Sequence, residues 1–216
     1  MDDALAKRLN QGAGALGISL PEGAVAPLLR HVELLLKWNR SINLTAVTDP
    51  AEVVEKHVLD SLAAAAFVPA GHLLDAGTGG GFPGIPIRLV RRDVEVTLVD
   101  SVGKKVAFLK NVIADLRLTG VQAVATRLGA PAARAATRLG PFDAAVARAF
   151  SAPEEWLTLA LGYVHPGGTI LCLAGPRDDL PERAGRATLL KIEELRLPFS
   201  GAVRRIGVYR VDREGG

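Results

Sequence analysis

The sequence predicts an α/β fold in which a mostly parallel sheet follows an N-terminal helical extension. Apolar residues recur at helical spacing up to residue 66, and from residue 67 onward short β-rich runs alternate with longer stretches. The 216 residues suffice for one α/β domain of ordinary size with a small extension. We therefore divide the chain into an N-terminal helical cap, residues 1–66, and an α/β domain, residues 67–216.

The helical spacing in the first part of the chain predicts three helices, at residues 4–9, 25–38 and 51–66. The second follows Pro21 and the third follows Asp49-Pro50. Between the last two lies the polar loop "NRSINLTAVTDP". Two interpretations remain open for Trp38, Asn39 and Asn43, which stand at its start: a core tryptophan with capping asparagines, or a cap docked over a ligand cleft.

The second part of the chain contains seven β-rich runs, at residues 72–76, 94–99, 121–126, 142–147, 168–174, 192–197 and 205–211. The first five are separated by more than ten residues, the spacing that parallel crossover connections require. The last two are joined by the short "PFSGAVR" segment, which indicates an antiparallel pair. We therefore expect a mostly parallel, seven-stranded sheet.

Composition indicates a cytoplasmic protein that does not cross a membrane. Hydrophobic residues make up 49% of the chain and charged residues 23%, and no apolar run approaches the ~18 residues that a membrane span needs. The N-terminus "MDDALAKRLNQG" lacks the pattern of a signal peptide. The single cysteine, Cys172, lies in the apolar run "TILCLA" and is expected in the core rather than as a nucleophile.

Charge is unevenly distributed. Residues 1–66 carry 6 Lys and Arg against 8 Asp and Glu, whereas residues 67–216 carry 20 against 15. A basic C-terminal part is typical of proteins with a polyanionic partner, although basic surfaces are common and this observation is weak when taken alone.

The stretch "LLDAGTGGGFPGIP" contains Gly79, Gly81 and Gly84 at the spacing of a dinucleotide fingerprint. It follows a predicted strand and precedes a helix expected from about Ile85, so a nucleotide-bearing ligand is expected at this turn. A bulky Phe82-Pro83 pair beside the turn fits poorly with a diphosphate, and this disfavours NAD.

Two acidic residues narrow the choice of ligand. Asp75 precedes the turn, where a carboxylate repels phosphates and suits a cationic ligand. Asp100 ends the second strand, where a carboxylate can accept from both hydroxyls of a ribose. A ribose, an amine and no phosphate together describe S-adenosyl-L-methionine. We expect Gly77, Gly79, Phe82 and Asp100 to bind it; NAD and a purely structural turn remain the alternatives.

Four segments in order, "LLKWNRSINLTAVTDPAEVVEKHVLDSL", "LLDAGTGGGFPGIPI", "TLVDSVGKKVAFLK" and "FDAAVARAFS", resemble the RsmG family of bacterial small-subunit ribosomal RNA methyltransferases, also called glucose-inhibited division protein B. The series from "KWN" through "NLT" to "HVLDS" is not shared by methyltransferases in general. The resemblance implies a class I, Rossmann-like S-adenosyl-L-methionine-dependent methyltransferase. It also implies N7 methylation of one guanine in 16S rRNA, in the small subunit or its precursor.

The resemblance also implies roles for further residues. Arg148 would contact the cofactor. Leu128 and Gly129 stand where the family usually has an Ala-Glu-like pair beside the adenine, so here any contact would be through the backbone. A family lysine before the glycine of the fifth strand is here Ala174. These departures leave open a catalytically weakened nucleotide-binding module of the same fold, and a methyltransferase with a different target.

For the RNA, the expected contacts are Lys104, Lys105, Arg148 and Arg204, each of which could also be ordinary surface charge. His57 and Asp60 share a helical face at a spacing seen in some metal pairs, yet no third ligand is near, so we expect hydrogen bonding or a cleft role and no metal. Guanine N7 carries a lone pair and no hydrogen, so no general base is required. The protein is expected to be a monomer.

Overall fold

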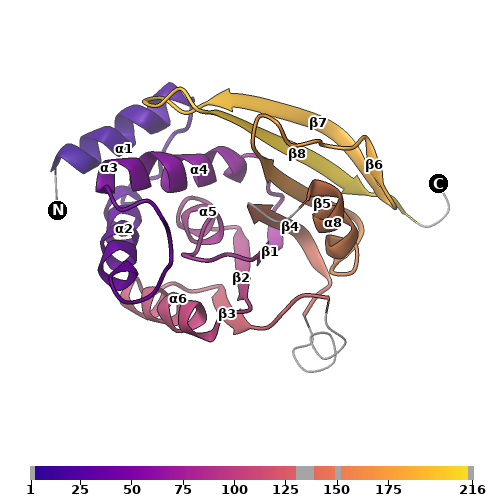
Figure 1. Cartoon of the computed structure of the whole chain (residues 1–216), viewed down its shortest axis with the longest axis horizontal. Coiled ribbons are helices and arrows are strands. Elements are labelled where there is room, and N and C mark those ends of the chain that lie inside the picture. The colour runs from indigo at the N-terminus through magenta and orange to yellow at the C-terminus, as the bar shows by residue number, and fades with distance from the viewer. Residues whose placement is uncertain (1–2, 130–138, 149–151, 214–216) are drawn as a thin grey trace.

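The computed structural model describes residues 3–129, 139–148 and 152–213 and contains one mixed sheet (Figure 1). The strands are β1 (Gly71–Ala76), β2 (Val94–Asp100), β3 (Val121–Ala125), β4 (Phe142–Arg148), β5 (Val164–Ala174), β6 (Arg183–Ala184), β7 (Ala187–Arg196) and β8 (Val203–Val211). Their spatial order is β3-β2-β1-β4-β5-β8-β7-β6. β1 to β5 run parallel, and β8 is antiparallel to both β5 and β7.

The sheet differs from the expected seven strands by the two-residue β6, which pairs antiparallel with β7. Gly185, with φ +58°, turns the chain between them. Two residues carry no periodicity, so the sequence pattern could not reveal this strand. β7 also begins five residues earlier than expected, because its first half is interrupted by a register shift between Leu189 and Lys191.

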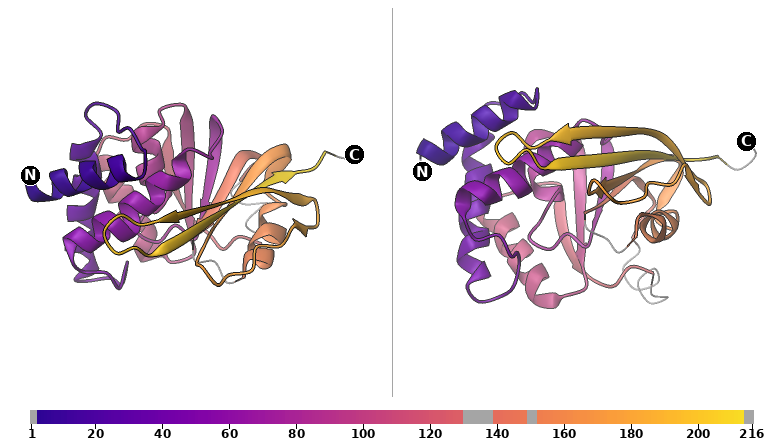
Figure 2. Two further views of the ribbon diagram at one scale, coloured as in Figure 1. Left: turned by 90° about the horizontal axis from the view of Figure 1, so that it is seen from above. Right: turned by 45° about the horizontal axis from the view of Figure 1, so that its top comes forward.

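Helices lie on both faces of the sheet (Figures 1 and 2). On one side are α1 (Asp3–Ala15), α2 (Val25–Asn39), α3 (Pro50–Val53), the π-helix η1 (Val54–Leu59), α4 (Asp60–Ala65), α5 (Gly84–Val90) and α6 (Gly103–Asp115). On the other side is α8 (Pro153–Ala160). No helix within the described ranges is both long and apolar enough to cross a membrane.

Two apolar clusters form the core, one on each face. Leu73 and Val146 pack with the side that carries α1 to α6, and the adjacent Leu74 and Ala145 pack with the α8 side. This alternation follows from the two-residue period of a strand. Cys172 is confirmed as a core residue, and burial raises the pKa of its thiol to about 12.

One core cluster crosses the boundary expected at residue 66. Leu9, Leu28 and Leu59 of the helical part pack in the same cluster as Leu73 of β1 and Leu98 of β2. The helical part is therefore fixed to the sheet by shared apolar packing, and the division of the chain into two parts stays a prediction about its organisation.

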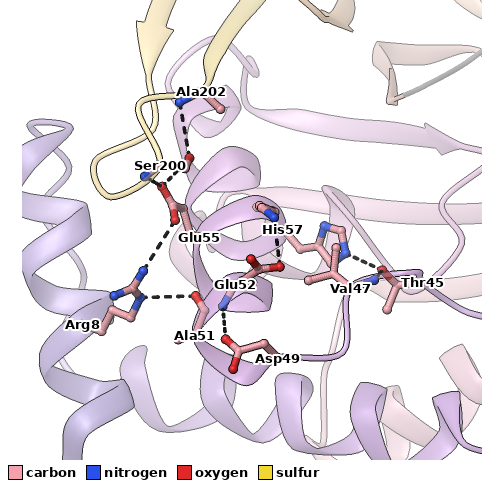
Figure 3. A network of polar contacts seen from close by, with 11 residues as sticks. Arg8, Thr45, Val47, Asp49, Ala51, Glu52, Glu55, His57, Ser200 and Ala202 are labelled. Atoms are coloured by element: carbon pink, nitrogen blue, oxygen red, sulfur yellow. Dashed lines mark hydrogen bonds and ion pairs between the residues drawn. The ribbon is translucent and has the colours of Figure 1, made fainter.

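Glu55 ties the tip of the β7–β8 hairpin to η1 (Figure 3). Its Oε1 accepts hydrogen bonds from the backbone N–H of Phe199 (2.9 Å), the backbone N–H of Ser200 (2.6 Å) and the Ser200 hydroxyl (2.8 Å). Its Oε2 lies 3.5 Å from Nη2 of Arg8. Burial raises the pKa of Glu55, but the hydrogen bonds from Ser200 and Phe199 and the charge of Arg8 outweigh it, so the pKa lies below its ordinary value of 4.5.

Replacing Glu55 with glutamine keeps the side chain's size and removes its charge. We expect the free energy of unfolding at neutral pH to fall by about 1–3 kcal/mol, since hydrogen bonds to a charged acceptor are the stronger ones. Because the folded pKa is depressed, protonation favours the unfolded chain. The stabilisation is therefore present above pH 4.5 and is lost as the pH falls through the folded pKa.

Urea unfolding at several pH values measures this loss. The control is Glu52→Gln, which removes a half-exposed partner of Lys56 on the same helical segment and should cost no more than about 0.5 kcal/mol. Equal losses for the two variants, or an Glu55→Gln effect that persists undiminished at pH 3, would contradict the role given to Glu55.

Candidate functional site

Two cavities at the ends of the parallel strands are lined by five of the predicted site residues, Gly77, Asp100, Leu128, Arg148 and Arg204. The first, here the Asp100 cavity, has a volume of about 240 Å³ and is lined by Gly77, Asp100 and Leu128 among others. The second, here the Arg148 cavity, has a volume of about 410 Å³ and is lined by Lys56, His57, Asp60, Arg148, Ala174 and Arg204 among others. A further cavity of about 400 Å³, beside the start of α2, contains none of the predicted residues.

Asp75 holds the two ends of the glycine loop together. Its Oδ2 accepts hydrogen bonds from the Thr78 hydroxyl (2.6 Å) and from the backbone N–H of Gly84 (2.7 Å). The side chain is fully buried, and burial raises its pKa to about 6. The expectation that this carboxylate faces a cationic ligand is therefore wrong, because its surface is already covered by the loop and α5.

Gly77 and Gly79 give the loop its shape, with φ angles of +65° and +57°, which side chains rarely adopt. At Gly84 the constraint is space: a Cβ there would lie 2.6 Å from Oδ2 of Asp75 and would also meet the side chain of Leu98. These glycines let the chain pass close over the ends of β1 and β2.

Phe82 points inward and supports the loop from below. It is 3% exposed, and its ring stacks on that of His31 at a centroid distance of 4.6 Å. His31, on α2, donates from Nε2 to the carbonyl oxygen of Gly80 (2.7 Å). Burial lowers the pKa of His31 to about 4, so the ring is neutral at physiological pH. Sequence reasoning missed His31, which carries no motif of its own.

Asp100 joins the glycine loop to the start of α6. Its Oδ2 accepts from the backbone N–H of Gly79 (3.0 Å) and its Oδ1 from that of Val102 (2.9 Å). Each carboxylate oxygen can accept a second hydrogen bond, and the side chain borders the Asp100 cavity. The residue can therefore hold the loop and accept from the hydroxyls of a ribose at once.

Leu128 lines the same cavity, whereas the N–H of Gly129 already donates to the Tyr163 hydroxyl (2.9 Å). A ligand contact through that N–H would have to displace Tyr163. The backbone of Leu128 is thus better placed than that of Gly129 for the adenine, and the role of this pair stays a prediction.

The predicted RNA-binding residues have different surroundings. Lys104 is exposed and makes no ion pair within the described part of the chain. Lys105 lies with its Nζ 4.0 Å from Oδ2 of Asp100. Arg204 pairs with Asp60, its Nε 3.4 Å from Oδ1. Of the four predicted residues, Lys104 alone has no carboxylate partner among the residues that the structure describes.

Arg148 ends β4 and reaches the helical part of the chain. Its Nη1 donates to the carbonyl oxygen of Lys56 (3.2 Å) and to Nδ1 of His57 (3.2 Å), and it lies 3.6 Å from Oδ2 of Asp60. His57 and Asp60 are thus brought together by a guanidinium, whose positive charge is incompatible with a metal ion in the same place. Within residues 3–129, 139–148 and 152–213 no cluster of three potential metal ligands occurs.

Comparison with known proteins shows the family of the whole chain. The family described as GidB, rRNA small subunit methyltransferase G, matches residues 25–206. The chain belongs to this family. Proteins named Ribosomal RNA small subunit methyltransferase G are 43% identical in Anaeromyxobacter dehalogenans, over 97% of this chain and 99% of that protein, and 43% identical in Myxococcus xanthus, over 94% and 95%. One from Acinetobacter baumannii is 39% identical, over 96% and 93%.

Solved structures with a similar fold include one that is named a methyltransferase. A precorrin-6y C5,15-methyltransferase from Geobacter metallireducens has a TM-score of 0.54 at 12% identity, covering 79% of this chain and 92% of that one. TrmN from Thermus thermophilus has a TM-score of 0.55 at 16% identity, covering 73% and 53%. At these identities they show that the fold is that of class I methyltransferases and nothing finer.

The segments by which the sequence resembles this GidB family adjoin one another in the structure. Asn39 of "KWN" accepts from the backbone N–H of Thr45 of "NLT" (3.0 Å), and Thr45 in turn contacts His57 of "HVLDS" (2.7 Å). His57 reaches Arg148. The motifs that are far apart in sequence therefore form one connected set of contacts beside the Arg148 cavity.

Alanine at Gly84 tests how closely the loop fits. We expect Gly84→Ala to lower the free energy of unfolding by about 1–3 kcal/mol through overpacking and to weaken ligand binding at the loop. Gly103→Ala is the matched control, because Gly103 also begins a helix but a Cβ there meets nothing within 4 Å. That control should be neutral or stabilising by up to about 1 kcal/mol. Denaturant unfolding measures both, and equal effects of the two would show that the loop tolerates a side chain.

Proposed function

We propose that this protein is an S-adenosyl-L-methionine-dependent methyltransferase that methylates N7 of a guanine in 16S rRNA of the small ribosomal subunit. The observation that carries the proposal is the GidB family match over residues 25–206, joined to relatives that share 43% of the sequence over nearly the whole of both chains. The class I fold and the cavity beside Asp100 support the cofactor.

The donor set at the Asp100 cavity suits this cofactor. Asp100 would accept from the ribose hydroxyls, and the backbone of Leu128 would meet the adenine edge. Gly77 and Gly79 let the chain approach closely. The bound cofactor supplies an activated methyl group on a sulfonium. The chain's own residues bind it, orient it and exclude water from the methyl.

No proton needs to be removed for N7 to react. Its lone pair would form the new bond to the methyl carbon as the carbon–sulfur bond breaks, and the positive charge passes to the purine ring. The histidines nearest the loop fit this chemistry, because burial lowers the pKa of His31 and of His57 to about 4 and so makes both rings weak bases. Catalysis would then rest on geometry.

Arg148 would act between the two ligands. A guanidinium that took guanine O6 and N7 together would occupy the reacting lone pair, so in this reaction Arg148 can meet O6 alone, a phosphate, or the carboxylate of the cofactor. Presenting the guanine in this pocket requires it to leave its stack in the folded RNA. We expect a monomer that acts in the cytoplasm on the small subunit or its precursor.

Methyl transfer tests the function directly. Labelled cofactor and unmodified 30S subunits should yield labelled 16S rRNA, and the N7 position can be located by reduction and aniline scission of the product. Cofactor binding without transfer to any RNA would indicate a weakened binding module, the alternative that Ala174 and the engaged Gly129 leave open. Label at another atom or in another RNA would indicate a different target.

Calorimetry tests the cofactor site. S-adenosylmethionine or its demethylated product should bind, and NADH should not. Asp100→Ala should weaken binding by about 1–3 kcal/mol, because the ribose hydroxyls lose their acceptor and the loop loses its tie to Gly79. Tight binding of NADH alone, or an unchanged affinity in the variant, would place the ligand elsewhere.

Salt dependence tests the RNA face. Lys104→Ala should reduce the slope of log affinity for rRNA against log salt by about 1 and leave cofactor affinity unchanged. Lys105→Ala and Arg204→Ala should lower the slope similarly if their guanidinium or ammonium turns to a phosphate, but each also frees a carboxylate, Asp100 or Asp60. The control is Lys110→Ala. Lys110 is exposed on α6, the helix that carries Lys104, about 9 Å farther along its axis. Equal slopes for all variants would mean that other residues hold the RNA.

A further inference from the structure

The π-helix η1 directs two acceptors to one nitrogen of Arg148. In η1 the backbone N–H of Asp60 bonds to the carbonyl oxygen of Glu55, five residues back, so this turn is wider than an α-helical one. The Lys56 carbonyl and the His57 ring both accept from Arg148 Nη1 at 3.2 Å. Asp60 adds a carboxylate 3.6 Å away. Both hydrogens of Nη1 therefore have acceptors.

The contact with Arg148 fixes the tautomer of His57. A guanidinium N–H can only donate, so Nδ1 of His57 must be the acceptor and carries no hydrogen. The neutral ring then has its hydrogen on Nε2, which donates to the Thr45 hydroxyl oxygen at 2.7 Å (Figure 3). That oxygen also accepts from the backbone N–H of Val47 (3.0 Å).

The position of Thr45 is fixed in turn by Asn39. The Asn39 side chain accepts from the backbone N–H of Thr45 (3.0 Å) and donates to its carbonyl oxygen (2.9 Å). A continuous chain of hydrogen bonds thus runs from the end of α2 through Thr45 and His57 to Arg148. Burial and the charge of Arg148 lower the pKa of His57 to about 4, so the acceptor at Nδ1 persists at physiological pH.

The Nε–Nη2 edge of the Arg148 guanidinium is available to a ligand. Its Nε and Nη2 make no hydrogen bond to any described residue, while its side chain is 22% exposed and lines the Arg148 cavity. These two nitrogens form the edge of a guanidinium that binds planar acceptors. Because the acceptors of η1 hold Nη1 on the opposite side, the Nε–Nη2 edge is fixed in one direction.

We propose that His57 is a positioning residue that, held by Thr45, fixes the guanidinium of Arg148 through Nδ1 so that its Nε–Nη2 edge meets a ligand of the methyl transfer reaction. The inference rests on the proposed function for its effect on rate. The orientation of Arg148 itself can be measured without any reaction.

Four substitutions separate the acceptor from mere packing. His57→Asn places an amide oxygen near the position of Nδ1, whereas His57→Gln places its amide near Nε2. His57→Leu fills the space without an acceptor. We expect the leucine and glutamine variants to lower kcat for rRNA methylation by about 10-fold or more, because a displaced group costs rate steeply. His57→Asn should recover most of it, and Thr45→Val should fall between them.

Nitrogen-15 NMR of the arginine side chains reports directly on whether the guanidinium of Arg148 is held in one orientation, which a purely structural role of His57 would not affect. In the wild type and in His57→Asn, Arg148 should show separate, slowly exchanging Nη signals, assigned by their loss in Arg148→Lys. In His57→Leu and His57→Gln these signals should average. The control is His165→Leu. His165 lies at the start of β5 and contacts Asp143 of β4, so its loss should leave both kcat and the Arg148 signals unchanged.

Wild-type kcat and separate Nη signals in His57→Leu would overturn the proposal. So would equal losses in folded His57→Asn and His57→Gln, since the position of the acceptor would then not matter. If the leucine variant does not fold, the asparagine and glutamine pair decides in the same way. If the wild type methylates no rRNA, the NMR comparison still decides whether His57 orients Arg148, and only the proposed function fails.

Discussion

The contact on which the site depends is that of Asp60 with Arg148 and Arg204. It joins the start of α4, the end of β4 and the start of β8, three segments far apart in the chain. A carboxylate that is only 8% exposed is costly to bury unless its charge is compensated. Arg148 and Arg204 both offset this cost, and their contacts with Asp60 join the helical part of the chain to the end of β4 and the start of β8.

The sequence predicts much of this arrangement because its strongest signals are local. Crossover spacing gives the parallel strands, and the glycine loop with Asp100 gives the ligand edge. Tertiary partners decide the rest. Asp75 is expected from the sequence to face a ligand, yet its side chain is fully buried and its Oδ2 accepts from Thr78 and Gly84. The roles of His31 and Gly129 come from hydrogen bonds to Gly80, 49 positions away, and to Tyr163, 34 positions away. Local sequence patterns cannot reveal such distant partners.

The electrostatics of the site favour holding ligands over moving protons. His31 and His57 are kept neutral by burial, and Asp75 is enclosed by the loop that it organises. Three of the cations that border the Arg148 cavity are paired, Arg148 and Arg204 with Asp60 and Lys56 with Glu52. Such a site can exclude water and align two reactants, which suffices for a nucleophile that already has a lone pair.

Methyl transfer without a general base has a measurable consequence for the single-turnover rate of rRNA methylation as a function of pH at saturating cofactor. Because no group has to lose a proton before N7 reacts, the rate should stay within about twofold between roughly pH 6.5 and pH 8.5. A rate that rises about tenfold per pH unit across part of that range would instead show that an essential base must lose its proton before N7 reacts.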